Sequence, residues 1–155
     1  HITRKIRWTH IGDGPERNHI LAYLTNLPSH IEVEFLGNLP HDSVLQYLKT
    51  EPIDLMLNTS SSEGVPVSIM EAYSHGIPVV ATDVGGNGEI VLKEHLIPSN
   101  INSEDIAKII NEWTEDPQIR EKVQIIQSKN FDSTKNAQKI ISIIDEITNE
   151  IEKAS

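Results

Sequence analysis

The chain has 155 residues, no cysteine and a formal net charge of −10. This length fits a single domain, and the absence of cysteine excludes a disulfide framework and thiolate chemistry. The acidic charge argues against nucleic-acid binding, because phosphate contacts need clustered Lys and Arg. Hydrophobic residues make up 37% of the chain and charged residues 23%, as is typical of a folded domain.

Strands and helices are expected to alternate along the first half of the chain. Short runs of apolar residues predict strands at residues 7–11, 31–36, 53–57 and 77–81. Apolar residues at helical spacing predict the helices between them, at residues 20–27, 44–48 and 66–75. Asp42 or Ser43 is the expected cap of the second helix, and Gly76 follows the end of the third. This alternation predicts an α/β fold, a Rossmann-like parallel sheet with helices on both faces.

The last third of the chain is expected to be a helical C-terminal segment. Ser103 caps the first helix of this segment, Asp116 precedes the second, and Asp132 or Ser133 starts the third. In the third helix one face is apolar. Part of this apolar stripe is expected to dock on the domain, and the rest to leave apolar area exposed. The members of the stripe are Ala137, Ile140, Ile141, Ile144, Ile147 and Ile151.

Ligands of parallel α/β folds bind at the carboxyl ends of the strands. The predicted ends are rich in Gly, Ser, Asn and Thr, and they comprise Gly12, Gly37 and residues 58–64 and 82–87. The first of these turns, GDGPER at residues 12–17, lacks the Gly-Lys-Ser/Thr ending of a P-loop and the third Gly of a dinucleotide fingerprint. Alone it predicts only a tight turn, although its glycines would let a ligand approach the backbone.

Other chemistries find little support in the sequence. The seven histidines show no metal-ligand spacing, and no Asp-x-Asp pair occurs, so no metal site is expected. The serines at residues 60–62 and 68 lie in no Gly-x-Ser-x-Gly elbow, and turn or cap roles are favoured for them.

Two glutamates are the specific feature of the sequence. Glu63 precedes an apolar run and Glu71 lies inside it, and no Lys or Arg occurs between Lys49 and Lys93. A buried carboxylate is costly unless it is paired or hydrogen-bonded. On general grounds Glu63 could favour a helix N-terminus, and Glu71 could pair with an Arg from elsewhere in the chain.

The string EGVPVSIMEAYSHGIPVVATDVGG, which begins at Glu63, resembles the E-x7-E block of group 1 (family 4) glycosyltransferases of the GT-B fold. The resemblance covers most of the chain in five further ordered segments. These are IGDGPER, VEFLGNLP, IDLMLNTSSSEG, DVGGNGEIV and NEWTEDPQIREKV.

The resemblance implies that residues 1–155 form one domain, the nucleotide-sugar-binding C-terminal half of a GT-B fold. The N-terminal acceptor domain and the first part of this domain are then expected to be absent. The resemblance also implies that the last helix extends toward the N-terminal domain, which leaves apolar area of its stripe exposed. By the same resemblance, Glu71 accepts hydrogen bonds from the donor ribose, Glu63 is the catalytic residue that contacts the transferred sugar, and the diphosphate lies at the helix N-terminus. The implied donor-binding residues are Gly12, Gly14, Asn38, Leu39, Glu63, Gly64, Val65, Pro66, Val67, Ser68 and Glu71.

The sequence departs from the family pattern at three places. Val65-Pro66 replaces the common Phe-Gly, and Pro66 has no N–H to donate. The segment after Val91 is shortened to LKEHLIP. The family's Arg and Lys that neutralise the diphosphate lie upstream of residue 1, and Arg4, Lys5 and Arg7 do not match them.

The expected function is therefore retaining, metal-independent and cofactor-free sugar transfer from a nucleotide-diphosphate sugar. The acceptor would be a carbohydrate or lipid-linked hydroxyl held by the N-terminal domain, as in polysaccharide or glycan biosynthesis, and the fragment alone would be inactive. A cytoplasmic location is expected, with peripheral association to the inner membrane face left open.

Two alternatives remain. The first is a non-catalytic nucleotide-sugar-binding module, against which the intact glutamates argue. The second is a phospho-receiver domain, which would need Asp where Asn58 stands and a Lys after residues 77–81.

Overall fold

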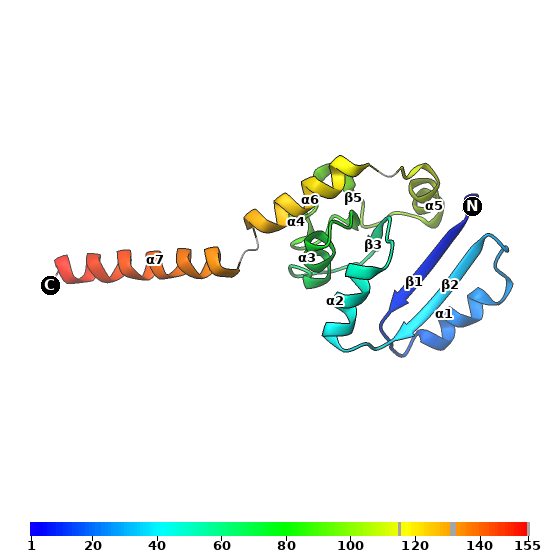
Figure 1. Cartoon of the computed structure of the whole chain (residues 1–155), viewed down its shortest axis with the longest axis horizontal. Coiled ribbons are helices and arrows are strands. Elements are labelled where there is room, and N and C mark those ends of the chain that lie inside the picture. Colours follow the sequence, from blue (N-terminus) through cyan, green and yellow to red (C-terminus); the bar gives the residue numbers. More distant parts are fainter. Residues whose placement is uncertain (115, 131–132, 155) are drawn as a thin grey trace.

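The computed structural model describes residues 1–114, 116–130 and 133–154. It is an α/β structure of parallel strands flanked by helices, from which one long helix projects (Figure 1). The predicted fold class is confirmed, as is the helical C-terminal segment.

The first two strands form a parallel pair. β1 (Ile6–Ile11) and β2 (Ile31–Gly37) pair from Ile6 opposite Ile31 to Ile11 opposite Gly37. The connection holds α1 (Arg17–Tyr23) and a 3-10 turn, η1 (Leu24–Asn26). In β2 the residues alternate between half-buried Ile31 and Val33 and exposed glutamates, as expected for a strand with one covered face.

The remaining strands form a second parallel sheet, in the order β3-β4-β5. They are β3 (Met56–Asn58), β4 (Val79–Thr82) and β5 (Leu96–Ile97), and α2 (His41–Thr50) leads from β2 to β3. The single sheet that the sequence predicted is thus divided, because β1 and β3 do not pair with each other.

The core surrounds β4. Its four residues are buried, and α3 (Val67–Ser74) and α6 (Pro117–Asn130) pack together beside it. Ile69, Tyr73 and Val123 are among the residues with no more than 1% exposure in this core. The other elements of this half are α4 (Asn87–Ile90), η2 (Lys93–His95) and α5 (Ser103–Glu112).

The last helix does not dock as the sequence suggested. α7 (Ser133–Ala154) extends away from the domain (Figure 1), and Ile140, Ile144 and Ile147 are 51–59% exposed. The docking prediction is therefore wrong for these three described residues, whereas their exposure agrees with the expectation that the helix leaves apolar area uncovered. The Ile151 side chain and the Asp132 cap lie outside the described residues.

Several predicted boundaries shift. α2 begins at His41 after an extended Pro40, so neither Asp42 nor Ser43 caps it. α5 is capped by Asn102, whose Oδ1 accepts from the Asp105 N–H at 2.9 Å, and Ser103 is its first helical residue. The strand expected at 53–57 is confined to Met56–Asn58, since Pro52 and Asp54 suit strands poorly. No described helix is long and apolar enough to cross a membrane.

Candidate functional site

Glu63 lies in the loop between β3 and α3 and is held by two side chains. Its Oε1 accepts hydrogen bonds from Ser60 Oγ at 2.6 Å and from Asn58 Nδ2 at 3.1 Å. The Ser60 bond, followed by the Asn58 bond, lowers the pKa of Glu63 below its ordinary value. Glu63 is therefore an oriented acceptor, and among the described residues none is found to bond its second carboxylate oxygen.

The loop that carries Glu63 rests on two glycines after β4. The Gly86 N–H donates to the Gly64 carbonyl at 2.8 Å, and the Thr82 hydroxyl donates to the Ser60 carbonyl at 2.6 Å. A Cβ on Gly85 would lie 1.8 Å from the Glu63 carbonyl oxygen, and Gly85 also has φ +51°. Only glycine permits both this approach and this conformation, so residues 82–86 set the position of Glu63.

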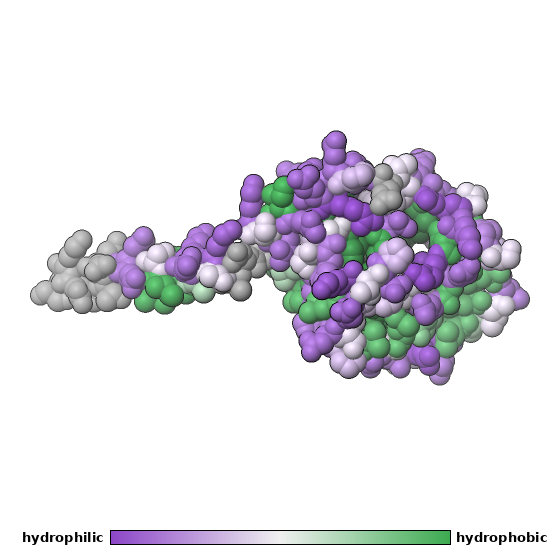
Figure 2. Space-filling view, in the orientation of Figure 1, coloured by the Kyte–Doolittle hydropathy of each residue, from purple (hydrophilic) through white to green (hydrophobic). Residues whose placement is uncertain are grey.

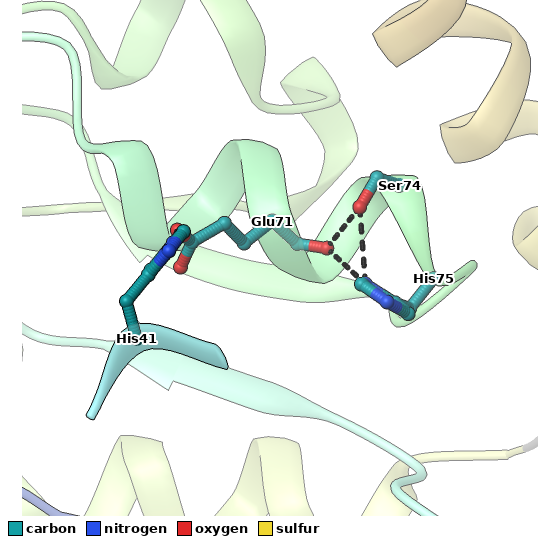
Figure 3. A network of polar contacts seen from close by, with 4 residues as sticks. All are labelled: His41, Glu71, Ser74 and His75. Atoms are coloured by element: carbon teal, nitrogen blue, oxygen red, sulfur yellow. Dashed lines mark hydrogen bonds and ion pairs between the residues drawn. The ribbon is translucent and has the colours of Figure 1, made fainter. Parts of the chain in front are cut away.

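Glu71 faces the first residue of α2, His41. Its Oε1 lies 2.7 Å from His41 Nε2, and its carboxylate is only partly exposed. Figure 3 shows His41 reaching from the start of α2 to this carboxylate. The imidazole, and not an Arg from elsewhere in the chain, is the partner of Glu71.

The same residue takes part in the end of α3. The main-chain oxygen of Glu71 accepts from the Ser74 hydroxyl at 2.7 Å and contacts His75 Nδ1 at 2.8 Å (Figure 3). These contacts give side-chain partners to a carbonyl of the last turn, where the regular backbone bonds of a helix end. His75 thus has a structural role, while the Glu71 side chain points to the opposite side toward α2.

The N-terminus of α3 lies between the two glutamates in sequence. Pro66 is buried, with φ −71° and ψ 118°, and its carbonyl accepts the Ile69 N–H. No described residue accepts from the N–H groups of Val67 and Ser68. Unpaired N–H groups at a helix start favour anions, so this turn can hold a phosphate.

Gly12 and Gly14 follow β1 and border a hollow of about 290 Å³, whose lining also includes His10, Arg17 and Phe35. The Gly12 N–H donates to the Gly37 carbonyl at 2.8 Å, which ties the end of β1 to the end of β2. Asn38 is exposed and Leu39 half-buried in the loop that continues to His41. The structure therefore links the Gly12 end to Glu71 through this loop, but the hollow contains neither glutamate.

Sequence reasoning included residues 58–64 and 82–87 among the ligand loops and gave Ser60 a turn or cap role. It did not connect Asn58, Ser60, Gly85 or Gly86 with Glu63. The spacing of Ser60 and Glu63 and the adjacent glycines were the available signals. His41 had no such signal, because it is 30 residues from Glu71. In the part of the chain that the structure describes, no three His, Cys, Asp or Glu side chains gather as metal ligands.

A family model described as glycosyl transferases group 1 matches residues 3–130. The chain belongs to the group 1 glycosyltransferase family. No curated protein matches it.

Among solved structures, the chain resembles Anabaena HepE in complex with UDP and glucose, with 27% identity and a TM-score of 0.73. HepE in complex with UDP-glucose gives 26% identity and a TM-score of 0.72. Each match covers 94% of this chain and 42% of HepE, so the chain spans less than half of that protein. Sucrose-phosphate synthase from Thermosynechococcus elongatus shares the fold at 21% identity and a TM-score of 0.65, over 97% of this chain and 39% of the synthase.

Proposed function

We propose that this glycosyltransferase domain binds a nucleotide-diphosphate sugar, in a retaining transfer of the sugar to an acceptor hydroxyl. The observation that carries the proposal is the start of α3 without a side-chain cap, which follows the oriented carboxylate of Glu63 in the chain and precedes that of Glu71. The complexes of HepE with UDP and UDP-glucose make UDP-glucose the first donor to test.

Glu71 is proposed to bind the ribose hydroxyls. Its carboxylate is acceptor-only when ionised, and a vicinal diol offers two donors. His41 already contacts Oε1, so the ribose must share that oxygen or use the other one. Asn38 and Leu39, which precede His41, are proposed to border the nucleobase.

Glu63 is proposed as the catalytic residue that contacts the sugar. Ser60 and Asn58 hold one carboxylate oxygen, which leaves the other to accept from sugar hydroxyls. A carboxylate that stays ionised can also stabilise positive charge that develops on the ring as the glycosidic bond breaks.

The diphosphate is proposed to lie at the start of α3. The N–H groups of Val67 and Ser68 are the donors there, while Pro66 contributes none. Gly64 and Val65 line the approach, and Gly12 and Gly14 the opposite wall. With a helix terminus in this role, no metal or cofactor is needed for donor binding.

The acceptor side of the reaction belongs to the same proposal. We place a carbohydrate or lipid-linked acceptor in a separate N-terminal domain of the protein, which would make the present chain alone unable to transfer sugar. Polysaccharide or glycan assembly is the role that fits such an acceptor.

The proposal is tested by Glu71→Gln and Glu63→Gln, with Glu121→Gln on the exposed side of α6 as the matched control. Glu71→Gln should weaken UDP binding, measured by calorimetry, by about 1–2 kcal/mol, within the range for a lost charged hydrogen bond. Glu63→Gln should bind UDP normally but slow sugar transfer by the full-length protein.

Three outcomes are decisive. If both variants bind UDP and turn over as Glu121→Gln does, the two carboxylates are structural and the proposal fails. If Glu71→Gln weakens UDP binding as expected but Glu63→Gln leaves the rate of sugar transfer unchanged, Glu63 is not catalytic. If the full-length protein binds UDP-glucose but neither transfers nor hydrolyses it, the domain is a non-catalytic binding module.

A further inference from the structure

The two glutamates of the candidate site are held in the same way but by different parts of the chain. In each of them Oε1 has side-chain partners, and none of the described residues is found to bond Oε2. The partners of Glu63, which are Ser60 and Asn58, belong to its own loop. The partner of Glu71 is His41, which begins α2. The orientation of the Glu71 carboxylate therefore depends on a contact between two helices, α2 and α3, which lie against each other.

The backbone places His41 through a defined turn. Pro40 precedes α2 with φ −56° and ψ 145°, and its carbonyl accepts the N–H groups of Ser43 and Val44 at 2.9 and 3.1 Å. The proline ring restricts φ at this point, so the first turn of α2 has a fixed start. The His41 main chain is thus positioned by α2, while its side chain reaches across to α3 (Figure 3).

The main chain of Glu71 is fixed independently, within α3. Its oxygen accepts the Ser74 hydroxyl at 2.7 Å, on the side away from α2 (Figure 3). The rotatable bonds of the side chain would still let the carboxylate move if nothing held it. His41 Nε2 lies 2.7 Å from Oε1 and is the donor, because an ionised carboxylate only accepts. A side chain ordered in advance costs a ligand less conformational entropy on binding.

The contact between His41 and Glu71 does little for the stability of the fold. The His41 side chain is 67% exposed, although that of Glu71 is only 17% exposed. Figure 2 shows hydrophilic side chains on the surface over α2, as expected for a helix start that is open to water. Ion pairs and hydrogen bonds with an exposed partner stabilise a protein very little. What the imidazole does determine is the direction of a carboxylate that belongs to the candidate site.

We propose that His41 is a positioning residue that orients Glu71 for the ribose of the nucleotide, and that this orientation gives the site its preference for ribonucleotides over deoxyribonucleotides. With Oε1 held, the carboxylate presents Oε2 in a defined direction, where it can accept from the 2′- and 3′-hydroxyls. A carboxylate that moves freely gains less from the 2′-hydroxyl, because it must first be ordered. The inference rests on the proposed ribose role of Glu71, which it extends to a second residue and to a class of substrate.

The test is calorimetry of the protein with UDP and with 2′-deoxy-UDP under the same conditions. The parent should bind UDP about tenfold more tightly than 2′-deoxy-UDP, the effect of one lost hydrogen bond to a charged group, and Glu71→Gln should lose most of this ratio. His41→Ala should lower the ratio to about threefold or less, with the affinity for 2′-deoxy-UDP changed by less than about twofold. His41→Gln, whose amide can donate over a similar reach, should restore the ratio.

Two further variants make the comparison specific. His19→Ala removes an exposed contact with Glu16 at the start of α1 and is the matched control, which should keep the ratio of the parent. If His41 acts through Glu71, the double variant His41→Ala/Glu71→Gln should bind UDP as Glu71→Gln does, within about twofold. A further loss in the double variant would overturn the inference, because His41 would then contact the nucleotide directly. An equal loss for both nucleotides in His41→Ala would also overturn it.

Failure of the inference and failure of the proposed function give different results. If Glu71→Gln loses the preference for UDP but His41→Ala keeps it, Glu71 binds the ribose without His41, and only the inference fails. If the parent shows no preference, or if Glu71→Gln retains it, the ribose role of Glu71 is wrong and the inference fails with it.

Discussion

The four glycines at positions 14, 37, 85 and 86 allow the support of Glu63 to be tested one physical factor at a time. Gly85 combines a positive φ of +51° with a backbone oxygen, that of Glu63, 1.8 Å from where a Cβ would be. Gly37 has a positive φ of +67° and no atom within 4 Å of that point. Gly86 has φ −80° but would place a Cβ 2.5 Å from the Gly64 carbonyl oxygen. Gly14 has neither feature.

The expected effects of alanine follow from these differences. Gly14→Ala should be neutral or stabilise the fold by about 0.4–1 kcal/mol, because it restricts only the unfolded chain. Gly37→Ala should destabilise the fold by about 1 kcal/mol. This is the cost of a left-handed backbone for alanine minus the gain from restricting the unfolded chain. Gly86→Ala should cost about 1–3 kcal/mol as an overpacked contact. Gly85→Ala combines the left-handed strain with the overpacked contact and should destabilise the fold by about 2–4 kcal/mol.

The assay is urea unfolding followed by tryptophan fluorescence, with all four variants measured beside the parent chain. The order of unfolding free energies should be Gly14→Ala, Gly37→Ala, then Gly86→Ala and Gly85→Ala, with the last the least stable. If Gly85→Ala proves no less stable than Gly37→Ala, the loop that carries Glu63 does not rest on the glycines after β4.

Three further predictions follow from single contacts. Ser60→Ala removes the hydrogen bond that contributes most to the lowered pKa of Glu63. This pKa should therefore rise toward 4.5 in an NMR titration of the variant. An unchanged pKa would show that Ser60 does not hold the carboxylate. Burial lowers the pKa of His95 below 6.5. Below about pH 6.5 the unfolded chain therefore binds a proton at His95 that the folded chain does not, and the free energy of unfolding should fall as the pH drops further. His95→Gln should flatten that slope in thermal unfolding, and an equal slope would exclude His95 as its source. Arg120→Met should lower the free energy of unfolding by about 1.5–3 kcal/mol, because Arg120 donates to the carbonyls of Ile53 and Gly76. The control Arg17→Met, on exposed α1, should be nearly neutral in the same unfolding assay.

The sequence by itself determined the local elements and the family. Strand-helix alternation, Pro66 before α3 and Gly76 after it are local patterns, and they were confirmed because propensity and capping act within a few residues. The E-x7-E block and the five segments around it led to group 1 glycosyltransferases, which the family match over residues 3–130 confirmed. The first residues of the helices were predicted less accurately than the presence of the helices. α2 starts after Pro40, ahead of both expected caps, and Asn102 caps α5 one residue before the expected Ser103.

Only the tertiary structure decided what the functional side chains touch. His41 is 30 residues from Glu71, and Gly85 is 22 residues from Glu63, so neither contact leaves a trace in local periodicity. The division of the strands into two sheets likewise depends on contacts between distant segments. Each of the four strands expected from the sequence is visible in its local pattern. Which edges meet depends on how the crossovers are wound, and that is set by packing between distant segments.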